Sequence, residues 1–283
     1  MTEDLQNRYR QLEWTPELVE RFWDFESHFP EQYYSFKFGS QIIDRSLDLL
    51  ALTHRKISDM VWLDFGCGHG SLTEQLLRRG LKVVIHDLSA ESLAICRNKS
   101  AGHPGFLGIL EETRASIDAV LLVEVVEHVD RETLEEIVGK LREVCAPGAW
   151  LVLTTPNAED IESPRAWVYC PSCDTVRHRW QHLRSFTAAS LARELRDLGL
   201  TEVRVSEENF SQVKRFGTKN PLRKLKRIVV GSSADIAPCN SNSPRSCSLS
   251  SSGATRVAMI TPLTARPFTS TSAPSTMPAV PFG

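Results

Sequence analysis

The stretch that most constrains the fold begins at Val61 and reads VWLDFGCGHGSLTEQLLRRG. A short apolar run leads into three alternating glycines and then into leucines at helical spacing. Strand, glycine loop and helix in this order are typical of nucleotide-binding sheets, because ligands lie at the carboxyl ends of the strands and a helix N-terminus offers unpaired N–H groups. The stretch therefore predicts a ligand-binding loop. Within it, Ser71 and Glu74 predict a capping box at the start of the helix.

The rest of the domain alternates strand-like and helix-like segments from Met60 onward, which is the rhythm of a parallel sheet. Apolar runs rich in β-branched residues predict buried strands at VWLDF, KVVIHD, IDAVLLV and AWLVLTT, and TEVRVSEE alternates like a further strand. Helices are expected after Gly70, after Asp130 and from Thr187, which can cap its helix. We expect a doubly wound α/β domain with a mostly parallel seven-stranded sheet and a Rossmann-like fold.

Composition divides the chain into four regions. Residues 1–57 predict an N-terminal helical cap or substrate arm, and residues 58–230 predict the ligand-binding domain. A polar Cys/His insertion interrupts that domain at 156–186. In residues 231–283, Ser, Thr and Pro supply 25 of the 53 residues, so this tail is expected to be disordered.

Two of these regions leave alternatives open. The cap is rich in aromatic residues between Trp14 and Phe38, which either pack on the core or form a lid that lines a substrate pocket. In the tail, TRVAMI is the one stretch that predicts a strand. The tail composition also fits a shifted reading frame near residue 230, in which case the last strand of the sheet would be missing.

Charge and hydropathy exclude several classes of protein. The chain has 33 basic and 35 acidic residues, so nothing drives the whole chain toward nucleic acid or an anionic membrane. The charged first residues do not resemble a secretory signal, and the apolar run AVLLV is too short to span a bilayer. A cytoplasmic protein is expected, whose seven cysteines serve as thiols or metal ligands rather than as disulfides.

The glycine spacing discriminates between two cofactor classes. A dinucleotide fingerprint, GxGxxG, would need a glycine at Ser71 or Thr73. Asp64, two residues ahead of Gly66, would repel a pyrophosphate, but it suits a ligand that carries an ammonium and a sulfonium group. Asp87 follows the next strand, where it can accept hydrogen bonds from ribose hydroxyls. A dinucleotide oxidoreductase is therefore the less favoured reading.

Four segments in order, LDFGCGHG, VVIHDLS, VLLVEVVEHV and PGAWLVLTTPN, resemble the class I S-adenosylmethionine-dependent methyltransferases over residues 57–210. The resemblance implies S-adenosylmethionine as cofactor. It also implies the following cofactor contacts: Asp64, Gly66, Gly68 and Gly70 around the methionine part, Asp87 on the ribose, Leu88 beside the adenine, and the backbone of Glu124 and Val125 near the transferring methyl.

One position departs from the family pattern. Family members often place an acid after the third strand to bind the adenine amino group, but Ile109 and Leu110 stand there. Glu111 and Glu112 are the candidate substitutes.

The segment EVVEHV suggests where the acceptor binds. It is similar to quinone-biosynthesis O-methyltransferases, which implies either a divalent cation at Glu124, Glu127 and His128, or His128 as a catalytic base; a purely structural turn is the alternative. The Asn/Asp-Pro-Pro-aromatic box of enzymes that methylate DNA bases or glutamine amides is absent. We therefore expect transfer to a small-molecule acceptor, at oxygen rather than at ring nitrogen or carbon.

The insertion carries YCPSCDTVRHRWQHLRSF, in which Cys170, Cys173, His178 and His182 have the spacing CxxCx4Hx3H. Four such ligands within a short polar segment predict a structural zinc site. Two alternatives remain: a metal-free loop with His182 in the substrate pocket, and a catalytic or redox role for the cysteines.

A rival function rests on KRFGTKNPLRKLKR, residues 214–227, which carries seven basic residues and no acid. Together with a zinc knuckle, this segment would suit a protein that binds or modifies RNA. A solvated helix face is the more ordinary interpretation, and the near-neutral charge of the chain weighs against nucleic acid as a partner.

Overall fold

The computed structural model describes residues 8–51, 56–211 and 256–263. A seven-stranded sheet with the order β4-β3-β2-β5-β6-β10-β9 forms its centre. The basic segment 214–227 lies outside the described residues. The strands are β2 (Val61–Phe65), β3 (Lys82–His86), β4 (Phe106–Ile109), β5 (Ile117–Val123), β6 (Cys145–Pro156), β9 (Arg204–Glu208) and β10 (Arg256–Leu263).

The sheet is parallel except at β10. Strand β2 lies in its middle, where Asp64 is paired with Ile85 of β3 and Leu121 of β5. Strand β10 runs antiparallel to both β6 and β9, which confirms the strand predicted at TRVAMI. Strand β10 fills the position between β6 and β9, and the shifted reading frame stays a hypothesis. The predicted fold class is confirmed.

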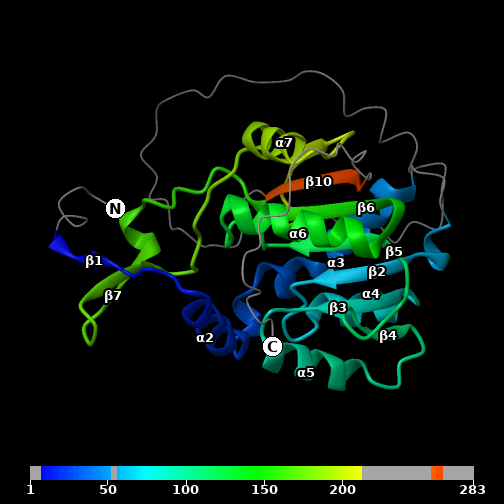
Figure 1. Ribbon diagram of the computed structural model, residues 1–283, viewed down its shortest axis with the longest axis horizontal. Coiled ribbons are helices and arrows are strands. Elements are labelled where there is room, and N and C mark those ends of the chain that lie inside the picture. The colour runs from blue at the N-terminus through cyan, green and yellow to red at the C-terminus, as the bar shows by residue number, and fades with distance from the viewer. Residues whose placement is uncertain (1–7, 52–55, 212–255, 264–283) are drawn as a thin grey trace, which may run out of the picture.

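Helices cover both faces of the sheet (Figure 1). On one face, buried side chains of α3, α4 and α5 pack with Trp62, Val83 and Leu121. On the other face, α6 and α7 pack against Leu63 and Val120. The helices are α3 (Tyr34–Leu50), α4 (Ser71–Arg78), α5 (Ala90–Ser100), α6 (Arg131–Val144) and α7 (Ala188–Asp197).

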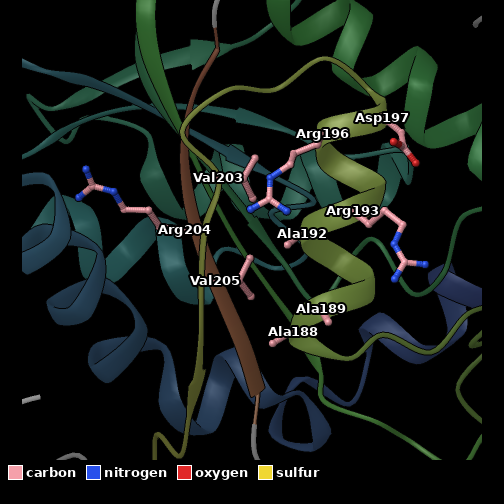
Figure 2. A pocket seen from close by; sticks show the side chains of 9 residues that line it. All are labelled: Ala188, Ala189, Ala192, Arg193, Arg196, Asp197, Val203, Arg204 and Val205. Carbon is pink, nitrogen blue, oxygen red and sulfur yellow. The ribbon is translucent and has the colours of Figure 1, made fainter. Parts of the chain in front are cut away.

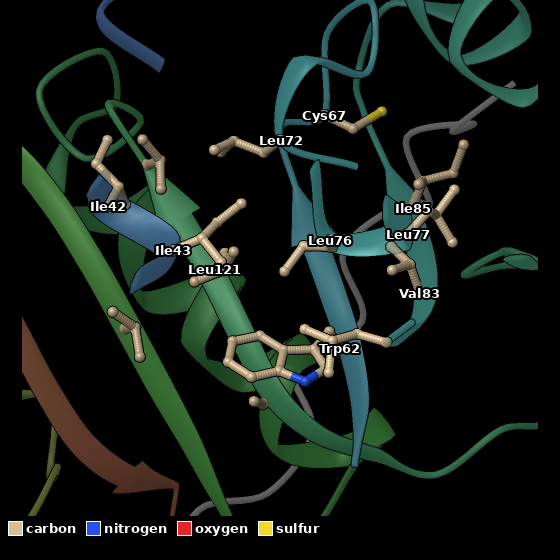
Figure 3. Packing of buried hydrophobic residues seen from close by; sticks show 14 of the residues in the cluster. Ile42, Ile43, Trp62, Cys67, Leu72, Leu76, Leu77, Val83, Ile85 and Leu121 are labelled. Carbon is tan, nitrogen blue, oxygen red and sulfur yellow. The ribbon is translucent and has the colours of Figure 1, made fainter. Parts of the chain in front are cut away.

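The N-terminal segment divides between core and cap. Ile43 of α3 is fully buried beside Trp62 and Leu76, and Figure 3 shows side chains of α3, α4 and the sheet gathered there. Helix α3 thus belongs to the core. The cap over the core therefore consists of helix α2 (Pro16–Ser27), whose N-cap residue is Thr15.

Two predicted helix starts have different outcomes. Helix α4 begins at Ser71, and its N-cap is Gly70 with φ of 86°. Ser71 is therefore already helical, so the predicted capping box is wrong, and Glu74 instead pairs with an arginine one turn later. Helix α7 is capped by Thr187 as predicted, and a capping box joins Thr187 to Ser190.

The insertion forms a small sheet of its own. Its strands are β1 (Arg10–Gln11), β7 (Trp167–Cys170) and β8 (Thr175–His178), in the order β1-β8-β7. In Figure 1, β1 and β7 lie beyond one end of the main sheet, with α2 between the two sheets. None of the helices in the described ranges is long and apolar enough to cross a membrane.

Candidate functional site

The glycine loop after β2 is shaped by three left-handed glycines. Gly66, Gly68 and Gly70 have φ of 80°, 49° and 86°. A Cβ atom on Gly66 would lie 3.0 Å from Val125 Cγ2, and one on Gly70 would lie 2.8 Å from Cys96 Sγ. A Cβ atom on Gly68 would meet nothing within 4 Å. Gly66 and Gly70 therefore allow close packing, whereas Gly68 borders open space in which a ligand can lie.

Asp87 joins this loop to the end of β3. Its Oδ2 accepts a hydrogen bond of 2.7 Å from the Gly68 backbone N–H, and its Oδ1 accepts one of 2.9 Å from the Ser89 N–H. Burial raises the pKa of the Asp87 carboxyl. Each carboxylate oxygen keeps a second lone pair, so Asp87 can also accept hydrogen bonds from ligand hydroxyls. The neighbouring Leu88 side chain is 66% exposed, which leaves an apolar surface beside Asp87.

Asp64 lies inside the protein. Its side chain is 1% exposed, and its Oδ2 accepts a 2.6 Å hydrogen bond from Thr73 Oγ1 of α4. Burial raises the pKa of the Asp64 carboxyl to about 6. The carboxylate thus ties the end of β2 to the helix that follows the glycine loop.

The chain turns sharply after β5, opposite the glycine loop. Glu124 has φ of 55°, and its N–H donates to the Thr154 carbonyl over 2.9 Å. Its Oε1 accepts a 2.8 Å hydrogen bond from Thr154 Oγ1. This left-handed residue brings Val125 against Gly66, so the backbone at Glu124 and Val125 lies next to the loop.

Glu111 and Glu112, the two acids that could bind the adenine amino group, each form an ion pair. Glu111 Oε1 lies 2.8 Å from His86 Nδ1 and 2.9 Å from Lys140 Nζ. Glu112 Oε1 lies 3.0 Å from Arg97 Nη1. An adenine contact at Glu111 or Glu112 stays a prediction.

Three histidines gather near the cap helix. The His128 ring lies edge-on to Trp23 at 4.6 Å and to His182 at 4.8 Å between ring centroids. The His182 ring stacks on His178 at 5.0 Å. His182 Nδ1 lies 2.5 Å from Glu159 Oε2, which is a short, charge-assisted contact.

The environment of the histidines sets their protonation. Burial lowers the pKa of His128 well below its ordinary value and lowers that of His178 to about 4, so both rings are neutral near pH 7. His178 Nδ1 accepts hydrogen bonds from the backbone N–H groups of Trp180 and His182, which leaves the ring proton on Nε2. In His182 the Glu159 carboxylate holds the Nδ1 proton, so Nε2 carries the basic lone pair.

Helix α2 is attached to both halves of the site. Trp23 Nε1 donates a 3.1 Å hydrogen bond to Gln181 Oε1, and Gln181 Nε2 donates one of 3.0 Å to the His128 carbonyl. The next residue, Asp24, accepts a 2.5 Å hydrogen bond from Ser89 Oγ, beside Asp87. The cap therefore spans from the Asp87 network to the histidines.

The cation site predicted at Glu124, Glu127 and His128 is not assembled in this form. Glu127, His128 and His182 offer ligand atoms that all lie within 4.8 Å of one another, but Glu124 is not a member of this group. The Glu124 carboxylate instead binds Thr154. The left-handed turn at Glu124 is the physical reason, since the chain changes direction between the two glutamates.

The four predicted zinc ligands are likewise not brought together in the structure, and the zinc site stays a prediction. Cys170 ends β7 and Cys173 lies in the turn that follows, next to Thr175 at the start of β8, whereas His178 ends β8. An extended strand separates these ends by roughly 10 Å. Across the part of the chain that the structure describes, neither cysteine joins a histidine in a metal-ligand group; His178 and His182 group with Glu159.

A surface hollow of about 750 Å³ lies elsewhere, between α7 and β9 (Figure 2). Its lining includes the exposed side chains of Arg193, Arg196 and Arg204, together with alanines and valines. None of the predicted site residues lines it. The hollow is therefore no part of the candidate site at the carboxyl ends of β2, β3 and β5.

Sequence reasoning missed several residues of this site. The aromatic cap did suggest a lid, which is the one signal that could have found Trp23. Asp24, Thr73, Glu159 and Gln181 carry no local motif, because each is defined by a contact with a distant part of the chain.

Comparison with known proteins supports the architecture. The model of the methyltransferase domain family matches residues 36–205. The ubiquinone biosynthesis O-methyltransferase of Paracidovorax citrulli is 31% identical over 150 residues, which cover 50% of this chain and 59% of that protein. The corresponding enzyme of Hahella chejuensis is 26% identical over 238 residues, 78% of this chain and 88% of that protein. The chain spans about three fifths of the length of the bacterial relatives that it matches at 28% to 31% identity.

A solved structure agrees at the level of the fold. The 1,6-didemethyltoxoflavin-N1-methyltransferase of Burkholderia thailandensis, crystallised with S-adenosylhomocysteine, superimposes with a TM-score of 0.54 at 16% identity and covers 90% of this chain and 92% of that protein. The family match spans more than half of the chain, and the sheet has one antiparallel strand between its last two parallel ones. The chain therefore belongs to the methyltransferase domain family.

Proposed function

We propose that this protein transfers a methyl group from S-adenosylmethionine to an oxygen atom of a small-molecule acceptor. The observation that carries the proposal is the Asp87 carboxylate, hydrogen-bonded to Gly68 at the edge of open space beside the glycine loop. Membership of the family supports the donor, and the relatives named ubiquinone biosynthesis O-methyltransferases support oxygen as the methylated atom. When bound, the cofactor supplies an electrophilic methyl group on a sulfonium.

The chain's own residues fit this cofactor. Asp87 would accept the ribose hydroxyls with its remaining lone pairs, and the exposed Leu88 side chain would cover the adenine. The backbone at Gly68 can approach the ligand closely, because no side chain fills the space beside it. Glu124 and Val125 would line the methyl-transfer end.

Asp64 would contribute in a less direct way. It is buried and bound to Thr73, so its role would be to hold the loop and to place a negative field beneath it. A buried carboxylate favours a nearby cationic ligand, because the local dielectric constant is low.

The acceptor would bind against the wall formed by α2 and the histidines. Trp23 and His128 present adjoining ring surfaces there, and His182 continues the wall. Aromatic walls with a few convergent polar groups suit a flat acceptor that carries a hydroxyl.

His182 would serve as the general base. Glu159 holds its Nδ1 proton, so its Nε2 can take the hydroxyl proton of the acceptor while the carboxylate stabilises the resulting imidazolium. His128, the base expected from sequence, is less suited, because its Nε2 lies 3.9 Å from Glu127 Oε1, too far for a hydrogen bond. We therefore assign His128 to the pocket wall.

The RNA alternative receives less support. The Cys/His set that would form a knuckle is not assembled among the described residues. The O-methyltransferases that match the chain are named for a role in ubiquinone biosynthesis. These observations favour a small-molecule acceptor.

The test is calorimetric titration with S-adenosylhomocysteine and, separately, with NADH. We expect binding of the first alone, and we expect Asp87→Asn to weaken it while Asp130→Asn, a control at an exposed helix cap, leaves it unchanged. Tight binding of NADH alone would refute the proposal. A screen of hydroxylated aromatic acceptors, read as release of S-adenosylhomocysteine, then tests the transfer itself; methylation of RNA without any small acceptor would favour the alternative.

A further inference from the structure

A second cluster of reactive side chains lies at the end of the β7–β8 hairpin, outside the proposed methyl-transfer site. The four-residue turn between Cys170 and Thr175 has the sequence PSCD. Cys170 is half-buried, Cys173 is exposed, and both are free thiols. The hairpin belongs to the small sheet that lies beyond one end of the main sheet in Figure 1. The proposed reaction uses neither sulfur.

The turn directs several hydrogen-bond donors at one sulfur. The Cys173 side chain and the backbone N–H groups of Ser172 and Cys173 lie within hydrogen-bond reach of the Cys170 sulfur. Donors that converge on a sulfur stabilise its thiolate form, which is the form that binds metals.

The second sulfur has a partner as well. Cys173 Sγ lies 2.9 Å from Thr175 Oγ1, whose side chain is 3% exposed. When Cys173 is a thiolate, the Thr175 hydroxyl is the donor in this contact. Each cysteine therefore has an outer-shell group that would orient it and neutralise part of its charge.

The turn is held in place by contacts other than the sulfurs. Tyr169 Oη donates a 2.9 Å hydrogen bond to Asp174 Oδ1 across the turn, and Asp174 adopts a left-handed φ of 51°. The Tyr9 ring packs on Tyr169 at 5.1 Å between centroids, which joins the hairpin to the N-terminal segment. The two sulfurs are thus presented by a preformed turn.

We propose that Cys170 and Cys173 bind a thiophilic d¹⁰ ion, such as Zn²⁺ or Cd²⁺, as a pair of thiolates with two coordination positions left open. Sulfur ligands select such ions, and two cysteines at i and i+3 around a tight turn can reach one tetrahedral centre. Among the described residues, no third His, Cys, Asp or Glu forms a ligand group with them. The open positions would take water or an added thiol, so the site is distinct from a closed structural zinc site.

The test uses the full reduced chain and Cd²⁺ as the probe, with thiolate-to-metal charge transfer in the ultraviolet as the readout. We expect one Cd²⁺ per chain with the absorbance of two thiolates. Cys170→Ser and Cys173→Ser should each weaken binding at least tenfold, and the double variant should lose this ion. The matched control is Cys145→Ser, since burial raises the pKa of the Cys145 thiol to about 12 and its loss should leave Cd²⁺ binding unchanged.

Three results would overturn the proposal. The first is equal Cd²⁺ binding by the double variant. The second is one ion per two chains with four thiolates, which would mean a closed site between two copies. The third is a Cys170–Cys173 disulfide that forms under mild oxidation in a protein whose reduced form binds no Cd²⁺. Because S-adenosylhomocysteine binding is expected to be the same in all variants, its titration checks folding without depending on the metal.

Discussion

Replacement of Asp64 with asparagine should stabilise the ligand-free protein at neutral pH. The side chain is 1% exposed, and burial raises its pKa from an ordinary value of 3.8 to about 6. One pKa unit corresponds to about 1.4 kcal/mol, so the charged form costs the fold about 3 kcal/mol. Asparagine keeps an oxygen that can accept the Thr73 hydroxyl proton but carries no charge. We therefore expect Asp64→Asn to gain about 1–3 kcal/mol in the free energy of unfolding at pH 7.5.

The gain should depend on pH in a defined direction. Below pH 3.8 the Asp64 carboxyl is protonated in both the folded and the unfolded chain, so the charge contributes nothing. Between pH 3.8 and about 6 the unfolded chain ionises first, and the folded wild type loses stability relative to the variant as the pH rises. Above about pH 6 the difference stays constant.

Urea unfolding of wild type and variant between pH 4.5 and pH 8 measures this difference, and effects common to both proteins cancel. Asp130→Asn is the control of opposite sign, because backbone hydrogen bonds lower the pKa of Asp130 at the start of α6. That variant should lose a little stability at neutral pH and approach wild type as the pH falls. A difference for Asp64→Asn that does not change with pH, or a variant equally destabilised at pH 4.5 and pH 7.5, would refute the reasoning.

Three further predictions concern the loop and the base. Gly70→Ala should lower the free energy of unfolding by about 2–4 kcal/mol in urea, because its Cβ would lie 2.8 Å from Cys96 Sγ at a left-handed φ of 86°; Cys96→Ala should recover only the steric part. Asp87→Asn should weaken S-adenosylhomocysteine binding at least tenfold, about 1.4 kcal/mol by calorimetry, since its amide would face a backbone N–H. Glu159→Gln should lower kcat for methyl transfer, because the His182 Nδ1 proton loses its carboxylate partner; unchanged kcat would contradict the base assignment.

The parts of the fold that sequence predicts well are those encoded by neighbouring residues. The strand IDAVLLV is a continuous apolar run, and as β5 it lies within the sheet, where both faces are covered. The strand predicted at TRVAMI is also present, as β10, and it pairs antiparallel with both β6 and β9. The glycines after β2 predicted the loop correctly, because glycine has no Cβ atom and adopts a left-handed backbone without strain.

The structure differs from the sequence predictions where one residue spacing fits two different backbone geometries. Ser71 and Glu74 have the spacing of a capping box, but Gly70 in the left-handed conformation moves the helix start by one residue. The CxxCx4Hx3H spacing places His178 and His182 near Cys170 and Cys173 along the chain. In the structure His178 ends β8, whose pairing with β7 separates the histidines from the cysteines. The pairing of β7 with β8 determines where the histidines lie, and a short stretch of sequence does not reveal that pairing.

The contacts that join the two halves of the site come from one turn of α2. Trp23 and Asp24 are consecutive, and a helix turns by about 100° per residue, so their side chains leave α2 in different directions. One reaches Gln181 beside the histidines, and the other reaches Ser89 beside Asp87. The distance between the Asp87 network and the histidines is therefore fixed by the position of α2 as well as by the sheet. No periodicity within α2 could reveal this, because both partners are contributed by loops far along the chain.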